Sequence, residues 1–414
     1  GIGVSAIARM FLVRGIEVSG SDTEESEIIK ELEKKGAKIF YEHKAENINE
    51  DIDLVVHTVA IDPGNPEFLK AKELGIEVRT YSQMLGIISD GYYTVAVSGT
   101  HGKTTTTAML AKVAVDSGLD PTVIVGSLLK DSGSNLITGK SDLFIVEACE
   151  YKRSFLDLSP NILVITNIEE DHLDYYKDLA DIQSAFIKLI EKLGPDDFVV
   201  CNPNDPKVVP VLEEVVCKVV DYTQVENITE LKVTGEYNQQ NAKAVFAVSE
   251  ILKVEKEKAL EALTDFEGVW RRFEYKGEIE TGAQLYTDYA HHPTEIRAVL
   301  KAVCEKFPSQ KIIAVFMPHL YSRTKLLFDD ISKSFKNTDK VLLTPIYAAR
   351  EKDDPSISSS ILADEINKNG SDAVAYDDFG AIEQYLKDNT QKDDIILTIG
   401  AGDVYKIGES LIKK

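Results

Sequence analysis

Residues 92–118 read YYTVAVSGTHGKTTTTAMLAKVAVDSG, and this stretch decides the fold class. An apolar run ends in a turn with two glycines, and a segment with helical character follows. Gly99 and Gly102 predict a loop whose backbone N–H groups face phosphate oxygens at the N-terminus of that helix. Lys103 would then reach the β- and γ-phosphates of a nucleotide, and Thr104 would bind Mg²⁺. The stretch therefore predicts a phosphate-binding loop between a strand and a helix.

This loop is a shortened form of the usual G-x-x-x-x-G-K-[ST] pattern, because Val97 occupies the first glycine position. Further metal ligands are expected where the neighbouring strands end, since ligands gather at the carboxyl edge of an open α/β sheet. Glu147 ends the apolar run 142–148, and His172 follows the apolar run 161–167. Each residue alone is also compatible with an ordinary strand end or loop. Their place after a phosphate loop favours a metal site.

The N-terminal stretch GIGVSAIARMFLVRGIEVSGSD has the spacing of a dinucleotide-type turn, with Gly1 and Gly3 followed by Ala6. Asp22 lies near the distance at which such folds place an acid on a ribose. A strand normally precedes this turn, and we expect that it lies upstream of Gly1. A plain strand-to-helix turn without a ligand is the simpler alternative.

Three restarts of the strand–helix alternation predict three α/β domains, each built on a mainly parallel sheet. The first is a Rossmann-like domain at 1–91, which we expect to lack its first strand. The second is a phosphate-loop domain at 92–270. The third is a second Rossmann-like domain at 271–414.

Composition restricts the class of protein. The net charge of −23 argues against nucleic acid as a general partner, because phosphate backbones are bound by clustered Lys and Arg. The longest apolar runs are far shorter than the roughly 18 residues of a membrane helix, so we expect no membrane insertion. Four widely spaced cysteines indicate neither a zinc site nor a disulfide framework, and a reducing cytoplasm is the simplest compartment.

Eight motifs occur in an order that resembles the Mur ligases, and the resemblance spans essentially the whole chain. The motifs are GTHGKTTTT (99–107), EACEYKRSFL (147–156), TNIEEDHLD (166–174), TGEYNQQNAKA (234–244), RRFEYKG (271–277), DYAHHPTE (288–295), MPHLYSRT (317–324) and GAGDVY (400–405). The resemblance is to the alanine-adding branch of the family. It implies three domains that bind a UDP-sugar, ATP and an amino acid. It also implies amide formation between UDP-N-acetylmuramate and L-alanine through an acyl phosphate in peptidoglycan assembly.

The resemblance also implies roles for individual residues. Lys103, Glu147, His172 and Arg272 would act in catalysis, and Thr104, Glu147 and His172 would bind Mg²⁺. ATP would be bound by Gly99, Thr100, His101, Gly102, Lys103, Thr104, Thr105, Asn238, Asn241, Arg272 and Asp288. The other substrates would be bound by Gly1, Gly3, Ser5, Asp22, His291 and Arg323. Tyr237 departs from the pattern, because many relatives carry His there.

Three alternatives stay open on the sequence. The chain could join a murein tripeptide, rather than alanine, to the same UDP-sugar. It could be a nucleotide-driven switch, although that leaves DYAHHPTE unexplained. It could also be a dinucleotide oxidoreductase, which leaves the phosphate loop unexplained. The sequence is compatible with a monomer or a homodimer.

Overall fold

The computed structural model describes residues 1–23, 25–59, 61–349 and 351–412. Residues 24, 60, 350 and 413–414, which fall within the predicted first and third domains, lie outside the described part. The chain divides into two compact units, which we treat separately. Unit 1 comprises Gly1–Glu170, Asp178–Asn227 and Asn241–Leu263, and unit 2 comprises Asp171–Lys177, Ile228–Gln240 and Thr264–Lys414.

The first 90 residues of unit 1 alternate between helices and short parallel strands. The elements are α1 Ile2–Val13, β1 Ser19–Ser21, α2 Glu27–Lys34, β2 Lys38–Phe40, η1 Ala45–Asn47, β3 Leu54–His57, α3 Pro66–Glu73, β4 Glu77–Thr80 and α4 Tyr81–Ser89. The parallel pairing expected here is present, but it takes the form of two separate pairs, β1–β2 and β3–β4. The alternation predicts a single sheet, and that prediction is wrong for the described residues. No described strand hydrogen-bonds to both pairs.

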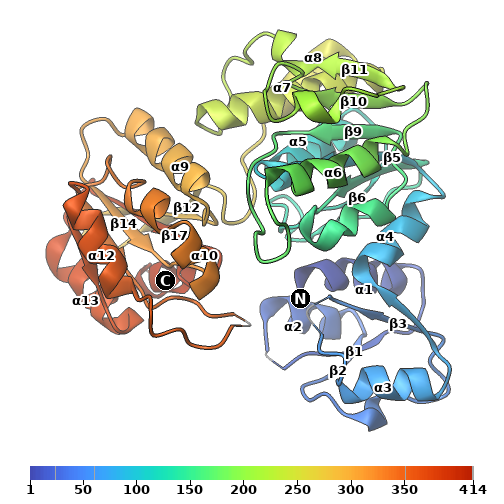
Figure 1. The fold of residues 1–414 in the computed structure, drawn as a ribbon, viewed down its shortest axis with the longest axis horizontal. Helices are drawn as coiled ribbons and strands as arrows, with labels where there is room; N and C mark the ends of the chain where they lie inside the picture. The colour runs from blue at the N-terminus through green and yellow to red at the C-terminus, as the bar shows by residue number, and fades with distance from the viewer. Residues whose placement is uncertain (24, 60, 350, 413–414) are drawn as a thin grey trace. The chain divides into compact units, whose positions relative to one another are not determined.

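The rest of unit 1 is built on a seven-stranded sheet of order β11-β10-β9-β5-β8-β6-β7 (Figure 1). All neighbouring strands are parallel except β6 and β7. The elements are β5 Tyr93–Ser98, α5 Lys103–Asp116, β6 Thr122–Ile124, β7 Leu136–Ile137, β8 Leu143–Glu147, η2 Tyr151–Asp157, β9 Ile162–Ile165, α6 Leu179–Ile190, β10 Phe198–Cys201, η3 Val209–Val211, β11 Lys218–Asp221 and η4 Tyr222–Gln224. Helices α7 Glu236–Ile251 and α8 Lys256–Thr264 follow in sequence.

The strand order reverses its direction between β5 and β9. The chain runs from β5 through α5 to β6 on one side, and from β9 through α6 to β10 on the other. Right-handed crossovers in opposite directions place α5 and α6 on opposite faces of the sheet. The carboxyl ends of β5 and β9 therefore form a topological switch point, which is where open α/β sheets bind ligands. The phosphate loop predicted from the sequence lies at this point.

Unit 2 is built on a six-stranded sheet of order β12-β13-β17-β14-β15-β16, in which only β12 is antiparallel to its neighbour. The elements are β12 Glu274–Glu278, β13 Gln284–Asp288, α9 Pro293–Lys306, β14 Ile312–Phe316, α10 Tyr321–Leu326, α11 Phe328–Ser332, β15 Lys340–Leu343, α12 Ser359–Lys368, β16 Ala373–Ala375, α13 Phe379–Asn389, β17 Ile395–Ile399 and α14 Tyr405–Leu411. Among the described residues, no helix of either unit is long and apolar enough to cross a membrane.

Both faces of this sheet are buried, and successive residues of its inner strands serve different cores. In β14, Ile312, Ala314 and Phe316 pack with α9 and α12, whereas Ile313 and Val315 pack with α13 and α14. The alternation follows from the pleat of a strand, which points consecutive side chains to opposite faces. Continuous apolar strands such as IIAVF are therefore typical of this buried parallel sheet.

Arg271 joins the start of β12 to the loop after β17. Its side chain is only 4% exposed, and its Nη2 donates to the carbonyl oxygens of Gly400 and, over 2.7 Å, Gly402. The guanidinium carbon also lies within 5.5 Å of the ring centres of Trp270, Tyr289 and Tyr405. These contacts satisfy a buried cation with carbonyl dipoles and aromatic faces. The motifs RRFEYKG and GAGDVY are thereby linked through one side chain.

Replacement of Arg271 by Met is expected to lower the free energy of unfolding of unit 2 by about 2–4 kcal/mol, because two charge-assisted hydrogen bonds and the cation–π contacts are lost. Urea unfolding followed by the fluorescence of Trp270, the single tryptophan of the chain, measures this change. The exposed Arg297, replaced by Met, serves as the control and should shift stability by less than about 0.5 kcal/mol. Equal effects of the two substitutions would rule out the anchoring role of Arg271.

Candidate functional site

The loop between β5 and α5 has the shape that a phosphate cradle requires. Gly99 has φ of 129° and Gly102 has φ of 83°, and both values lie in the region that favours glycine. Gly102 is also the N-cap of α5, so the loop leads directly into the positive end of that helix. Asn241 of α7 is buried against the loop, since a β-carbon at Gly102 would lie 2.6 Å from its Oδ1.

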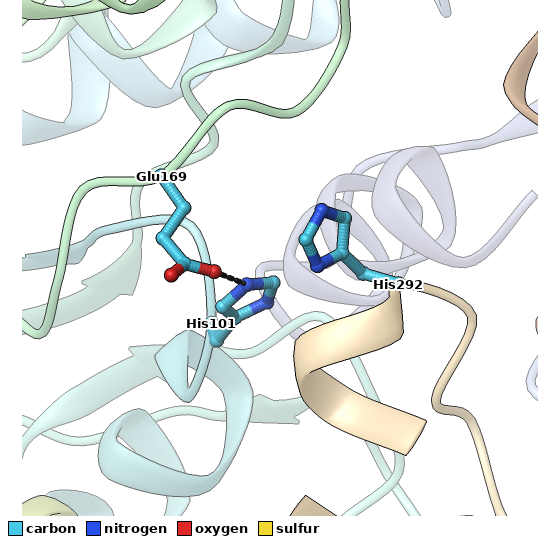
Figure 2. Close-up of side chains that lie close together, drawn as sticks. All are labelled: His101, Glu169 and His292. Carbon is cyan, nitrogen blue, oxygen red and sulfur yellow. Dashed lines mark hydrogen bonds and ion pairs between the residues drawn. The ribbon is translucent and has the colours of Figure 1, made fainter. Parts of the chain in front are cut away.

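The loop is fastened to the residues that follow β9. The backbone N–H of Thr100 donates to the carbonyl of Asn167 over 3.0 Å, and that of His101 donates to Asn167 Oδ1 over 2.9 Å. The Thr100 hydroxyl accepts the backbone N–H of Glu169 over 2.8 Å. The imidazole of His101 lies 2.9 Å from Glu169 Oε2 (Figure 2). The two strand ends of the switch point therefore hold the loop in one shape.

Lys103 points into this loop from the first turn of α5. Its Nζ donates to the carbonyl oxygens of Gly99 and Thr100 over 2.6 and 2.9 Å, and it lies 3.0 Å from Glu150 Oε2. Burial alone would lower the pKa of the Lys103 ammonium, but the carboxylates of Glu150 and Glu147 outweigh burial and raise the pKa above its ordinary value. Lys103 is therefore a positive charge held at the phosphate loop.

Thr104 and Glu147 meet beside this lysine. The Thr104 hydroxyl donates to Glu147 Oε1 over 3.0 Å, and the backbone N–H of Gly126 donates to Glu147 Oε2 over 2.7 Å. Thr105 is the next residue of α5 and is buried. A hydroxyl and a carboxylate are hard oxygen donors of the kind that Mg²⁺ prefers. The donor set therefore fits the metal that the sequence predicts here.

In unit 2, Arg272 and Asp288 lie close together next to Tyr237. Asp288 ends β13, is buried, and accepts the backbone N–H groups of Phe273 and Ala290, each over 2.7 Å. Burial raises the pKa of Asp288 to about 6, although the positive charge of Arg272 opposes this shift. Burial likewise raises the pKa of the Tyr237 hydroxyl, and the Asp288 carboxylate adds to the effect.

Asn238 follows Tyr237 in the first turn of α7. Its side-chain amide donates to the Thr234 carbonyl over 2.7 Å, and the residue is buried. Asn241 lies three residues further along the same helix, so both amides project from one side of it. Asn238 and Asn241 therefore lie on one continuous helix.

His172 and Arg323 converge on Asp171 within unit 2. Arg323 donates to Asp171 Oδ1 over 2.9 Å, and His172 has φ of 55° with its backbone N–H donating to the same carboxylate over 2.7 Å. Burial would raise the pKa of Asp171, but His172 and Arg323 outweigh burial and hold it well below its usual range. Burial lowers the pKa of His291 to about 4, so its imidazole is neutral at neutral pH. His292, also drawn in Figure 2, caps α9.

The N-terminal part of unit 1 contains a cavity of about 470 Å³. Gly1, Ser5 and Asp22 line it. Gly3 is not among the lining residues, and a β-carbon there would lie 3.1 Å from the ring of Tyr81. A larger residue at position 3 would therefore press against Tyr81.

Three family models match successive parts of the chain. They are "Mur ligase family, catalytic domain" at residues 1–93, "Mur ligase middle domain" at 97–262 and "Mur ligase, glutamate ligase domain" at 271–402. The chain belongs to the Mur ligase family. The expected α/β architecture of three domains with mainly parallel sheets is confirmed by these matches and by the sheets described above.

Relatives within the family extend over nearly the whole chain. A UDP-N-acetylmuramate--L-alanine ligase of Clostridium kluyveri is 43% identical and covers 99% of this chain and 95% of its own. One of Acetivibrio thermocellus is 44% identical over 100% of this chain and 94% of its own. The crystal structure of a UDP-N-acetylmuramate-alanine ligase of Thermotoga maritima is 29% identical, with a TM-score of 0.83 over 99% of this chain and 96% of that one.

This member of the Mur ligase family contains polar residues that the sequence analysis does not assign to its site. Glu150 and Glu169 contact the phosphate loop, yet neither belongs to a pattern with a fixed spacing from Lys103. In the N-terminal cavity, Ser21 and His43 contact the Glu67 carboxylate at 2.5 and 3.2 Å. Only the fold brings these side chains together. Their place in the motifs EACEYKRSFL and TNIEEDHLD, of which the second is rich in acidic residues, is the one signal that points to the first two.

Replacement of Gly99 by Ala is expected to destabilise unit 1 by about 2–4 kcal/mol and to abolish nucleotide binding. The new β-carbon would lie 2.1 Å from Thr166 Oγ1 and 2.9 Å from the Asn167 carbonyl, on a backbone that disfavours any side chain. Thermal unfolding with and without ATP measures both effects. Gly118→Ala is the matched control, because Gly118 also has positive φ but open space around it. If Gly99→Ala behaved like Gly118→Ala, the tight fit of the loop would be refuted.

Proposed function

We propose that this chain is an ATP-dependent ligase that joins L-alanine to the carboxylate of UDP-N-acetylmuramate during peptidoglycan biosynthesis. The observation that carries the proposal is the phosphate loop, where Lys103, Thr104 and Glu147 lie together at a topological switch point. A ligase of this name that is 43% identical over 99% of this chain supports the choice of substrates.

The chemistry starts from a carboxylate, which is a poor acyl donor. Transfer of the γ-phosphoryl group from ATP to the UDP-N-acetylmuramate carboxylate gives an acyl phosphate and ADP. The amine of L-alanine then attacks the acyl carbon, and the tetrahedral intermediate collapses to the amide with loss of phosphate. Such transfer depends on positioning and on stabilisation of charge at the phosphate oxygens. Lys103 and the N-terminus of α5 supply positive potential at the loop, and we assign the same task to Arg272, which lies just before β12.

We assign the metal ligands to Thr104 and Glu147, with His172 completing the set. The hydroxyl of Thr104 and the carboxylate of Glu147 match the oxygen-rich sites in which Mg²⁺ binds with substrate phosphates, and the imidazole of His172 would add one nitrogen ligand. When bound there, Mg²⁺ would neutralise negative charge on the phosphates. The loop residues Gly99 to Thr105 would cradle the phosphates, and Asn238, Asn241 and Asp288 would address the adenosine.

The other substrates are assigned by chemistry. Gly1, Gly3, Ser5 and Asp22 would face the uridine diphosphate, with three of them lining the N-terminal cavity. Arg323 would bind a carboxylate, and the neutral imidazole of His291 would not repel the ammonium group of alanine. We infer domains at 1–91, 92–270 and 271–414, a cytoplasmic location, and a monomer or homodimer, which light scattering distinguishes.

Phosphate release from ATP tests the proposal. The assay contains UDP-N-acetylmuramate and Mg²⁺, and L-alanine, glycine, L-serine or the murein tripeptide is added in turn. Release that requires both the UDP-sugar and L-alanine is expected. Release without either substrate would refute a ligase, and a preference for the tripeptide would select the cell-wall recycling reaction instead. Omission of Mg²⁺ should abolish release.

A further inference from the structure

Glu150 is a buried carboxylate that the proposed ligase chemistry does not use. It lies three residues after the end of β8, and its side chain is 3% exposed. Its two oxygens are 3.1 and 3.0 Å from Lys103 Nζ. A buried carboxylate is retained only where a charge or donor compensates its desolvation. Lys103 provides that compensation.

The backbone after Glu150 adopts a conformation that non-glycine residues avoid. Lys152 and Arg153 have φ of 52° and 58°, in the left-handed region where a non-glycine residue is strained. The Arg153 side chain donates to Asp181 Oδ1 of α6 over 2.5 Å, and its backbone N–H donates to the Glu150 carbonyl over 2.9 Å. The segment is therefore tied to α6 in spite of this local strain.

Packing fixes the same segment from its other end. Phe155 is buried and meets Phe186 of α6 edge to face, with ring centres 5.1 Å apart. The backbone N–H of Phe155 donates to the carbonyl of Cys149 over 3.0 Å. An aromatic pair of this geometry stabilises a core beyond the effect of its buried area. Glu150 is therefore held in one place by its flanking residues, rather than being free to follow Lys103.

A fixed negative charge at this place opposes the binding of phosphate. Lys103 contacts Glu150 and two carbonyl oxygens of the loop, so the ammonium is already compensated before a nucleotide arrives. Phosphates that contact Lys103 must come within a few ångströms of the Glu150 carboxylate as well. Like charges at such distances repel each other, and the repulsion is stronger where they are partly buried than it is in water.

We propose that Glu150 is a positioning residue for Lys103: it is the resident counter-ion of the phosphate loop, holds the ammonium in the loop, and weakens the grip of the loop on nucleotide phosphates. The inference rests on the proposed function, because it takes the loop to be a nucleotide site. ADP must leave after each turnover, and a partly compensated lysine releases it more readily than a free one.

The test is the dissociation constant of ADP for the full chain and for the Glu150→Gln variant, measured by titration calorimetry. The neutral isostere should bind ADP about tenfold more tightly, because repulsion is removed while the lysine keeps a hydrogen-bond acceptor. Adenosine has no phosphate, so its affinity, measured by competition with ADP, should be the same for the parent chain and for Glu150→Gln. A merely structural role predicts the reverse, since a disturbed loop weakens binding of both ligands.

Control variants separate the effect of the Glu150 charge from the effect of its side-chain shape. Glu150→Asp keeps the charge and should retain the affinity of the parent chain within about threefold. Asp116→Asn removes a carboxylate that pairs with Lys112 at the far end of α5, about 20 Å along the helix from Lys103, and should not change ADP binding. If Glu150→Gln does not fold, Glu150→Ala is the second neutral variant and should also bind ADP more tightly.

The outcomes are distinct. Absence of ADP binding by the parent chain would refute the nucleotide site itself, and with it the proposed function. ADP binding by the parent chain with equal or weaker binding by the folded neutral variants would overturn only the role of Glu150. Parallel tightening of ADP and adenosine would also overturn it, because the effect would not involve phosphate.

Discussion

Replacement of Lys103 by Ala is expected to lower turnover by about a thousandfold or more, because the loop loses the charge that stabilises the transferred phosphoryl group. The Lys103 ammonium also compensates the buried Glu150 carboxylate, so the free energy of unfolding should fall by about 3 kcal/mol. Phosphate release and urea unfolding measure the two effects separately.

Two further variants separate the effect of Lys103 on turnover from its effect on stability. The double variant Lys103→Ala/Glu150→Ala should recover most of the lost stability but none of the lost turnover, since it removes both buried charges. Lys112→Ala changes another lysine of α5 that pairs with Asp116, and its turnover should stay within about twofold of the parent chain. Turnover above a tenth of the parent level in folded Lys103→Ala would contradict the assignment of the loop.

Replacement of Glu147 by Gln is expected to lower turnover by about a hundredfold and to raise the Mg²⁺ concentration for half-maximal turnover by at least about tenfold. The amide is a weaker metal ligand than the carboxylate, and it has one oxygen to accept both Thr104 Oγ1–H and the Gly126 N–H. Phosphate release at a series of Mg²⁺ concentrations gives both values.

The matched control is Asp142→Asn, which removes an exposed carboxylate from the other end of the same strand. It should leave the Mg²⁺ dependence unchanged. An unchanged Mg²⁺ dependence in Glu147→Gln would exclude this carboxylate as a metal ligand, whatever happens to turnover.

The sequence predicts those features of the site that depend on residues close together in the chain. Gly102, Lys103 and Thr104 are consecutive, so their spacing alone places an N-cap, a cation and a hydroxyl at the start of one helix. The strand end at Glu147 follows from an apolar run. The position of Glu147 beside Thr104 also follows, because parallel strands of one sheet end at the same edge.

Other features depend on contacts that no local pattern encodes. Glu150 contacts Lys103 just before a turn in which Lys152 and Arg153 are left-handed, although neither is glycine. The first sheet was expected to be continuous, because helix–strand alternation indicates parallel pairing but not which pairs join. Short edge strands such as β16 of Ala373–Ala375 have too few residues to show a period of two.

The pleat of β14 has a consequence for how unit 2 tolerates change. Ile313 and Val315 share no core with Ala314 and Phe316, although the four residues are consecutive in the chain. Substitutions that lie far apart and share no partners contribute additively to stability. Away from the shared strands, the two cores of unit 2 can therefore diverge independently of one another during evolution, while a single backbone carries both.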